Sequence, residues 1–351
     1  KTFNKQEHDS DVPPRKIQRI VEDKNGYIWV KTIDRKLYVF NKVTECFHAV
    51  YDDMKNYSEN IQVIKLQNTA EGDVLLLTKD KNLLLAGVDE KGQVTIKILF
   101  DSRDEINKHD YTLKHHVLCE TEEYISWIGT DYKVSAVHKG AELASRPADF
   151  ITSKINSGDK DSFTSFFEDG RKVWVGDRAG IFYSIDVRTG LVNRYVLSEI
   201  KGAISNLLVT PAGYVYLSVA GQGTYEYDLA ERRLQKINTE MNDAMVTHAF
   251  IDQYDKIWFH ENEKALIYYD PLNHTAKRFP FTMFGKITTL YSEDAGERGL
   301  FFLSPAGEAW LFDREHAEMV YINKLKQLSN DRANQQFYHL MLDNDGVLWL
   351  S

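Results

Sequence analysis

The chain has 351 residues and a formal net charge of −9, and 12% of its residues are aromatic. The negative charge repels polyanions and no Lys/Arg run forms a basic stripe, so we expect no nucleic-acid partner. No apolar run approaches the roughly 20 residues of a membrane-spanning helix, so membrane attachment is expected only through segments outside this sequence. Aromatic and β-branched residues are spread along the chain, which favours strands.

The two ends of the sequence and its cysteines bear on processing and redox chemistry. Residues 1–5 lack the apolar core of a signal peptide. The sequence starts without Met and stops at residues 348–351, inside a motif, so we expect it to be part of a longer protein. Cys46 and Cys119 fall in different repeats, and we predict two small buried apolar groups, with no disulfide and no metal site.

A short segment with an aromatic or large apolar centre, which we call the anchor, recurs at intervals near 46 residues. Two of the copies, those at Leu75 and Phe302, are degenerate and lack Trp. A period of this length with strand-forming residues is typical of propeller blades. The anchors are Trp29, Leu75, Trp127, Trp174, Tyr216, Trp258, Phe302 and Trp349.

Each repeat contains four strand signals in one order. An alternating apolar strand A precedes a turn rich in Asp, Asn and Gly, such as residues 22–26, and the anchor strand B follows. Gly and Asn tolerate the positive φ that a tight hairpin requires. Strand C, such as residues 181–186, ends in Asp, and strand D, such as residues 193–197, follows a polar turn. Four short antiparallel strands in this order make one blade.

We therefore predict an all-β chain that forms a single β-propeller domain over residues 1–351. Seven blades are the preferred count, and residues 337–351 then start an eighth unit or a following propeller. The alternative is an eight-bladed propeller, in which this last pair joins a strand around Phe3. The complete blades are expected near residues 17–50, 61–100, 115–151, 161–197, 203–238, 246–281 and 287–323.

The repeat resembles the regulator-propeller repeat in its strand A, Glu-Asp turn and Trp strand. Residues 17–30 carry the pattern most plainly, and residues 163–186 are the next best copy. The sequence departs from the pattern at residues 32–36, which replace the usual Thr-x-x-Gly, and at Leu75 and Phe302, where Trp is missing. The resemblance covers nearly the whole chain, and its motifs belong to the scaffold.

The resemblance implies the periplasmic sensor region of a hybrid two-component system histidine kinase of gut bacteria. In such proteins two seven-bladed propellers precede a β-sandwich, a membrane span, a histidine kinase and a DNA-binding domain. Their ligands are often oligosaccharides. For this chain the resemblance implies a non-enzymatic module that senses a glycan fragment, with an adjacent propeller, a sandwich domain and a second copy as partners in the full-length protein.

No motif in the sequence indicates an enzyme. The nucleophile elbow, the zinc helix and the P-loop are all missing. Acidic pairs such as Glu22-Asp23 recur at the same turn, which favours turn chemistry over glycoside cleavage. His115 and His116 are neighbours on a strand and point to opposite faces, which argues against joint metal ligation. We expect no catalytic residue, cofactor or metal, and keep a propeller lyase or glycosidase and a protein-binding scaffold as alternatives.

The loops between strands B and C differ most from blade to blade, and in propellers they share a face with the D–A connections. Ligand sites on repeat scaffolds gather where such loops converge. The polar and aromatic groups there suit a hydroxyl-rich ligand, and a local basic pocket for an acidic sugar is compatible with the net charge. The candidate ligand-binding residues are Arg15, Arg35, His109, Tyr111, Asp131, Tyr132, Arg178, Gln222 and Glu261.

Overall fold

The computed structural model divides into two compact units, each described here by itself. Unit 1 comprises residues 1–112, 140–147 and 289–351, and unit 2 comprises residues 113–139 and 148–288. The structure describes residues 17–55, 62–80, 82–101, 113–121, 123–129, 133–140, 150–154, 163–237, 246–284, 290–294, 296–324, 337 and 339–350.

The described residues form seven four-stranded antiparallel sheets, each with its strands in chain order, and one two-stranded sheet. The fold is therefore the all-β, seven-bladed propeller that the repeat predicts. No helix among these residues is long and apolar enough to cross a membrane.

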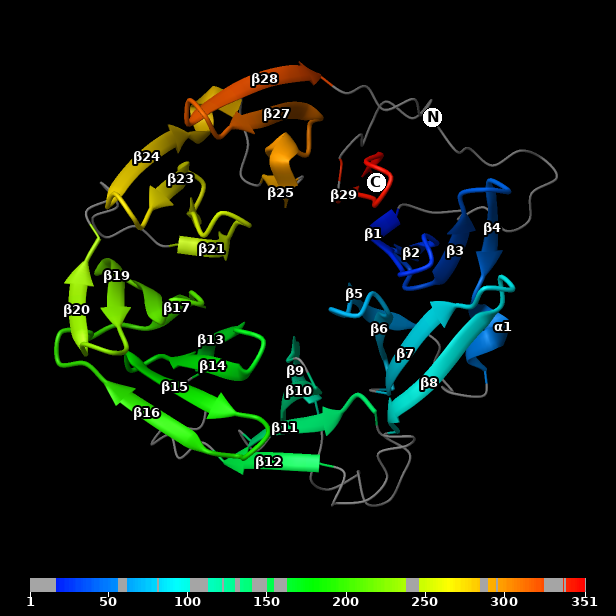
Figure 1. Ribbon diagram of the computed structural model, residues 1–351, viewed down its shortest axis with the longest axis horizontal. Coiled ribbons are helices and arrows are strands. Elements are labelled where there is room, and N and C mark those ends of the chain that lie inside the picture. The colour runs from blue at the N-terminus through cyan, green and yellow to red at the C-terminus, as the bar shows by residue number, and fades with distance from the viewer. Residues whose placement is uncertain are drawn as a thin grey trace. The chain divides into compact units, whose positions relative to one another are not determined.

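Unit 1 contains blades 1, 2 and 7 and the two-stranded sheet (Figure 1). Its elements are β1 (Ile17–Glu22), β2 (Ile28–Thr32), β3 (Leu37–Asn41), β4 (Cys46–Ala49), α1 (Tyr51–Met54), β5 (Val63–Asn68), β6 (Val74–Thr78), β7 (Leu83–Val88), β8 (Val94–Phe100), β25 (Tyr291–Asp294), η3 (Gly296–Arg298), β26 (Leu300–Leu303), β27 (Glu308–Asp313), β28 (Glu318–Lys324), β29 (Leu340–Leu342) and β30 (Leu348–Leu350).

Unit 2 contains blades 3 to 6. Its elements are β9 (Leu113–Glu120), β10 (Tyr124–Gly129), β11 (Lys133–His138), β12 (Phe150–Lys154), β13 (Phe163–Glu168), β14 (Lys172–Asp177), β15 (Ile181–Asp186), β16 (Val192–Val196), β17 (Ile204–Val209), β18 (Tyr214–Val219), β19 (Gly223–Asp228), β20 (Arg233–Lys236), β21 (Val246–Ile251), β22 (Ile257–Glu261), β23 (Ala265–Asp270), β24 (Thr275–Pro280) and η2 (Phe281–Phe284).

The anchor strand of blade 1 is buried on both faces because it packs against two neighbours within unit 1. In blade 1, Trp29 belongs to the cluster shared with blade 2, whereas Ile28 and Val30 belong to a cluster on the opposite face. Trp29 and Trp258 are fully buried and Trp174 is 2% exposed. The prediction that the anchors serve packing between sheets is confirmed for Trp29 and Trp174, which lie in clusters shared with the next blade.

The aspartates of the A–B turns hold the anchor tryptophans. Asp23 Oδ2 accepts a hydrogen bond from Trp29 Nε1 at 2.8 Å, and Asp23 Oδ1 accepts the turn amides of Asn25 and Tyr27. The same bond to indole recurs from Trp174 to Asp169, from Trp258 to Asp252 and from Trp349 to Asp343. The acidic turns are thus used for structure, as their recurrence predicts.

The two-stranded sheet lies between blade 7 and blade 1 of unit 1. Strand β29 contacts β25 on one side and β1 on the other (Figure 1). Met341 and Trp349 pack with blade 1, whereas Leu340 and Leu348 pack with blade 7. The eighth A–B pair is therefore integrated into the packing of unit 1.

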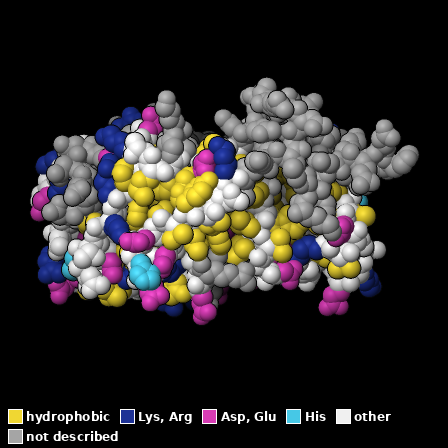
Figure 2. Space-filling model, turned by 90° about the horizontal axis from the view of Figure 1, so that it is seen from above, with side chains coloured by type: hydrophobic (Ala, Val, Ile, Leu, Met, Phe, Trp, Pro, Cys, Tyr) yellow, Lys and Arg dark blue, Asp and Glu magenta, His cyan; other side chains and the backbone are white. Residues whose placement is uncertain are grey.

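Two surface features complete the description. Cys119 is buried as predicted, but the prediction for Cys46 was wrong, because Cys46 lies on the outer strand β4 and is exposed. On the face drawn in Figure 2, Lys and Arg side chains are mixed with Asp and Glu, so the described residues form no continuous basic stripe there.

Candidate functional site

Four of the nine candidate ligand-binding residues lie in the described part of the chain, each at the B–C end of its sheet. Arg35 belongs to unit 1, and Arg178, Gln222 and Glu261 belong to unit 2. The other five candidates lie outside the described residues, namely Arg15, His109, Tyr111, Asp131 and Tyr132.

Two of the candidates in unit 2 form hydrogen bonds within the protein. Gln222 accepts the amide of Lys201 at 2.6 Å and donates to the carbonyl of Glu199 at 3.1 Å, which ties its turn to the connection between blades 4 and 5. Glu261 is 5% exposed and accepts from Arg278 at 2.8 Å. These groups position the B–C ends, while Arg178 is exposed at its turn.

A β-bulge marks strand A at the same end of five sheets. Because the strands are antiparallel, this start of strand A lies beside the end of strand B and the B–C turn. A bulge locally bends the strand and re-aims a side chain, and bulges are common next to binding sites. The residue that follows the bulge differs among these five blades: Arg19, Lys65, Ser165, Asn206 and His248.

Three cations gather at the bulge of blade 1. Arg19 lies directly opposite Lys31 across β1 and β2, and Arg35 occupies the following turn in the left-handed conformation, with φ of 67°. Lys31 is 6% exposed and its ammonium donates to Gln18 Oε1 at 2.6 Å. Burial, and then the charges of Arg35 and Arg19, lower the pKa of Lys31. We call Arg19, Lys31 and Arg35 the cation cluster.

Two ionisable residues interact electrostatically with Arg19 of this cluster: Glu293 in blade 7 and His339 just before β29. Burial, and then the charge of Arg19, lower the pKa of His339 to about 3. The buried Nδ1 of His339 has no hydrogen-bond partner. Burial raises the pKa of Glu293, although the Leu342 amide and Arg19 act in the opposite direction. One carboxylate thus acts on Arg19 from this side.

A histidine pair occupies the equivalent place in blade 6 of unit 2. His248 lies opposite His260 across β21 and β22, with ring centroids 5.8 Å apart. His260 is 7% exposed, packs against Phe250 and Phe281, and has no hydrogen-bond partner at Nε2. Burial, and then the charge of His248, lower the pKa of His260 to about 4.

This histidine makes the fold sensitive to acid. Between pH 6.5 and about 4 the unfolded chain takes up a proton that folded His260 refuses, so stability is expected to fall by about 3 kcal/mol over this window. In the variant His260→Gln, the number of protons taken up on unfolding in this pH window should be lower by about one. Urea unfolding between pH 7 and pH 4 measures it, with the exposed His316→Gln as control. An unchanged pH dependence in His260→Gln would contradict the assignment.

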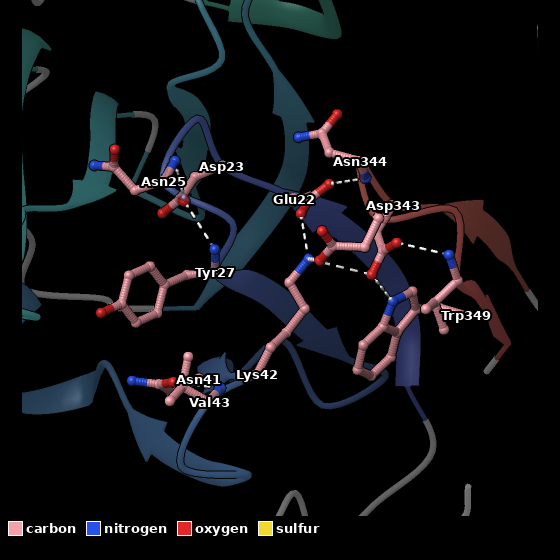
Figure 3. Close-up of polar contacts among 12 residues, drawn as sticks. Glu22, Asp23, Asn25, Tyr27, Asn41, Lys42, Val43, Asp343, Asn344 and Trp349 are labelled. Atoms are coloured by element: carbon pink, nitrogen blue, oxygen red, sulfur yellow. Dashed lines mark hydrogen bonds and ion pairs between the residues drawn. The ribbon is translucent and has the colours of Figure 1, made fainter.

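A cluster of three acidic residues in the described part of unit 1 has the geometry of a cation site. Carboxylate oxygens of Glu22, Asp343 and Asp345 lie within 4.8 Å of one another. The ammonium of Lys42 reaches them at 2.7, 3.3 and 2.5 Å, and the amide of Asn344 donates to Glu22 Oε2 at 2.7 Å (Figure 3). The protein's own lysine therefore occupies the centre and joins blade 1 to the β29–β30 hairpin.

The cation cluster was missed because sequence reasoning searched the loops. Its core, Arg19 and Lys31, lies on strands A and B, and the opposition of these residues depends on the bulge. The available signal was the position ten residues before the anchor, which holds Arg19, Lys65 and His248 in different blades. A scaffold position that repeats while its residue changes is a candidate for function.

Comparison with known proteins identifies the fold. No family model and no curated protein matches the chain. BamB from Moraxella catarrhalis is 10% identical with a TM-score of 0.54, over 96% of this chain and 93% of that chain. This chain is a β-propeller. Virginiamycin B lyase from Staphylococcus aureus is likewise 10% identical, with a TM-score of 0.50, over 82% of this chain and 92% of that chain.

A third similar structure is the extracellular domain of BT4673 from B. thetaiotaomicron, described as a hybrid two component system. It is 15% identical with a TM-score of 0.49, and the match covers 95% of this chain and 51% of that chain. The propeller thus spans about half the length of that domain.

Proposed function

We propose that this propeller is a non-enzymatic, ligand-sensing module of a hybrid two-component regulator and that it binds an oligosaccharide. The regulator-propeller pattern in residues 17–30 and 163–186 supports the sensor role. The same resemblance supports a periplasmic location, an adjacent propeller and sandwich domain, a dimer in the full-length protein, and a histidine kinase elsewhere in that protein.

The observation that carries the proposal is a difference between the two ends of the sheets. At the A–B end, the same Asp-to-Trp hydrogen bond recurs from blade to blade. At the B–C end, the residue after the bulge is a different polar or charged group in each of the five blades that have this bulge, as with Arg19, Asn206 and His248. Repeated positions maintain the scaffold, so recognition is proposed for the end that varies.

A sensor transmits a signal only if its ligand binds one arrangement of the receptor more tightly than another. The propeller would therefore contribute differential affinity, and no bond in the ligand need be broken. This requirement separates the proposal from the lyase and glycosidase alternative, in which the saccharide is consumed.

Calorimetric titration with a panel of plant and host oligosaccharides tests the proposal. Binding with the saccharide recovered intact supports a sensor, and the recovered ligand is assayed for new reducing ends and unsaturated products. Cleavage would replace the proposal with the enzyme alternative. Absence of binding across the panel would contradict ligand sensing by this propeller and favour a protein-binding scaffold.

A further inference from the structure

We propose that the cation cluster of blade 1 binds the anionic group of an acidic saccharide, which is either a uronate carboxylate or a sulfate ester. This inference rests on the proposed function and names the class of its ligand. It starts from Lys31, a buried residue whose ammonium has the neutral amide oxygen of Gln18 as its hydrogen-bond partner.

Other poorly exposed lysines of this chain show what a compensated ammonium looks like. Lys139 pairs with Glu120 at 2.5 Å, Lys256 pairs with Asp270 at 2.7 Å, and Lys42 reaches three carboxylates. A buried charge is costly unless it is paired. The ionic groups that act on Lys31 are Arg35 and Arg19, which repel it.

The strand register holds this repulsion in place. Arg19 and Lys31 are partners across the β1–β2 ladder, and like charges directly opposite each other destabilise a sheet. An anion bound between them would supply the missing partner. Arginine suits this role because its planar fork binds carboxylate and sulfate oxygens in pairs.

Access to the cluster comes from its two arginines. Arg19 and Arg35 are exposed residues, although burial lowers the pKa of Arg19. A ligand in solvent can therefore approach Arg35 and the exposed part of Arg19. The turn that carries Arg35 is firmly held, because its amide donates to the Thr32 carbonyl and its carbonyl accepts the Val63 amide, both at 2.9 Å. Thus Lys31 forms the buried base of the site and the arginines form its rim.

The acids near the cluster are engaged in other contacts. Asp34 accepts from the Thr32 hydroxyl at 2.6 Å within the turn. Glu293 accepts the Leu342 amide at 3.3 Å, and its charge raises the pKa of Arg19. His339 has a lowered pKa and is neutral at pH 7. Three cations, Arg19, Lys31 and Arg35, face the two carboxylates of Asp34 and Glu293, so the local balance of charge is positive and favours an anionic ligand over a neutral one.

Calorimetry on the 351-residue chain tests the site with three probes: trigalacturonate, a sulfated chondroitin disaccharide and neutral cellotriose. We expect at least one acidic probe to bind at least about tenfold more tightly than cellotriose, with affinity falling as NaCl rises. Lys31→Met and Arg19→Gln should each weaken that binding by about tenfold or more. Lys24→Met, at the opposite end of the same sheet, should leave binding unchanged, because Lys24 pairs with Asp73 there.

Thermal unfolding gives a readout that does not depend on saccharides. Sodium sulfate should raise the Tm of the wild-type chain more than NaCl of equal ionic strength does, and Lys31→Met should abolish this difference. The variant itself should be as stable as wild type or more stable, since it removes an uncompensated charge and keeps the aliphatic stem. A folded Lys31→Met protein therefore makes any loss of binding interpretable.

The outcomes separate this inference from the proposed function. Selectivity for trigalacturonate identifies a carboxylate, and selectivity for the chondroitin probe identifies a sulfate ester. Equal binding of acidic and neutral probes, unaffected by Lys31→Met, overturns the anion site and leaves oligosaccharide sensing intact. A sulfate effect on Tm that needs Lys31, without binding of any saccharide, supports an anion site and contradicts oligosaccharide sensing. Neither binding nor a sulfate effect overturns both.

Discussion

Asp23→Ala is expected to lower the free energy of unfolding by about 3–5 kcal/mol, because one buried carboxylate serves four donors. Asp23 is 1% exposed. It accepts the amides of Asn25 and Tyr27, the indole of Trp29 at 2.8 Å, and the amide of Val88 in blade 2 at 3.2 Å. Alanine would leave the indole and the Val88 amide buried without an acceptor.

A matched variant tests the reason for this loss. Asp169 bonds its anchor Trp174 in the same way at 2.7 Å, but Asp169 is exposed and its other contacts are turn amides. Water can replace those bonds, so Asp169→Ala should cost about 1 kcal/mol. Urea unfolding of both variants measures the difference. Equal losses would show that burial and the contact with blade 2 do not set the cost.

Lys42→Met is expected to lower the free energy of unfolding by about 3 kcal/mol, because removing one partner of a buried ionic group leaves the others uncompensated. The side chains of Glu22 and Asp343 are 7% and 0% exposed, and both bond the Lys42 ammonium. Burial lowers the pKa of Lys42, but the three carboxylates outweigh it and the net shift is upward. The contact favours the charged form of Lys42.

Hydrogen exchange shows where this loss acts. In Lys42→Met the amides of β29 and β30 should exchange faster, since the hairpin loses its ionic contact with blade 1, while amides of β6 and β7 keep their rates apart from the global change. Lys24→Met serves as control, because the exposed Lys24–Asp73 pair is expected to contribute under about 1 kcal/mol. Uniform acceleration throughout unit 1 would contradict a local role for Lys42.

Much of the architecture could be predicted because each blade is made by local chemistry. The Asp-to-Trp distance is five or six residues, so Asp23 and Trp29, like Asp169 and Trp174, meet within one hairpin. Strand order and the buried anchors follow from the same short-range pattern. Position on the outermost strand was not visible in this pattern, which is why Cys46 was wrongly expected to be buried.

The candidate site was harder to predict because side-chain partners come from other strands and blades. Gln222 lies on a B–C turn as expected, yet its amide bonds the connection at Glu199 and Lys201. Glu261 is likewise paired with Arg278 of an outer strand. Sequence identifies the turn on which a polar residue lies, but its hydrogen-bond partners depend on how the strands meet.

The repeat by itself determined the blades, their strand order and the structural use of Trp29 and Asp23, because these features arise within about a dozen consecutive residues. Only the tertiary structure decided that Arg19 faces Lys31, since a bulge in the ladder sets that register. It also decided the place of the β29–β30 hairpin, whose contact between Lys42 and Asp343 joins residues 301 positions apart. Contacts over such separations depend on the packing of whole blades, which no local pattern encodes.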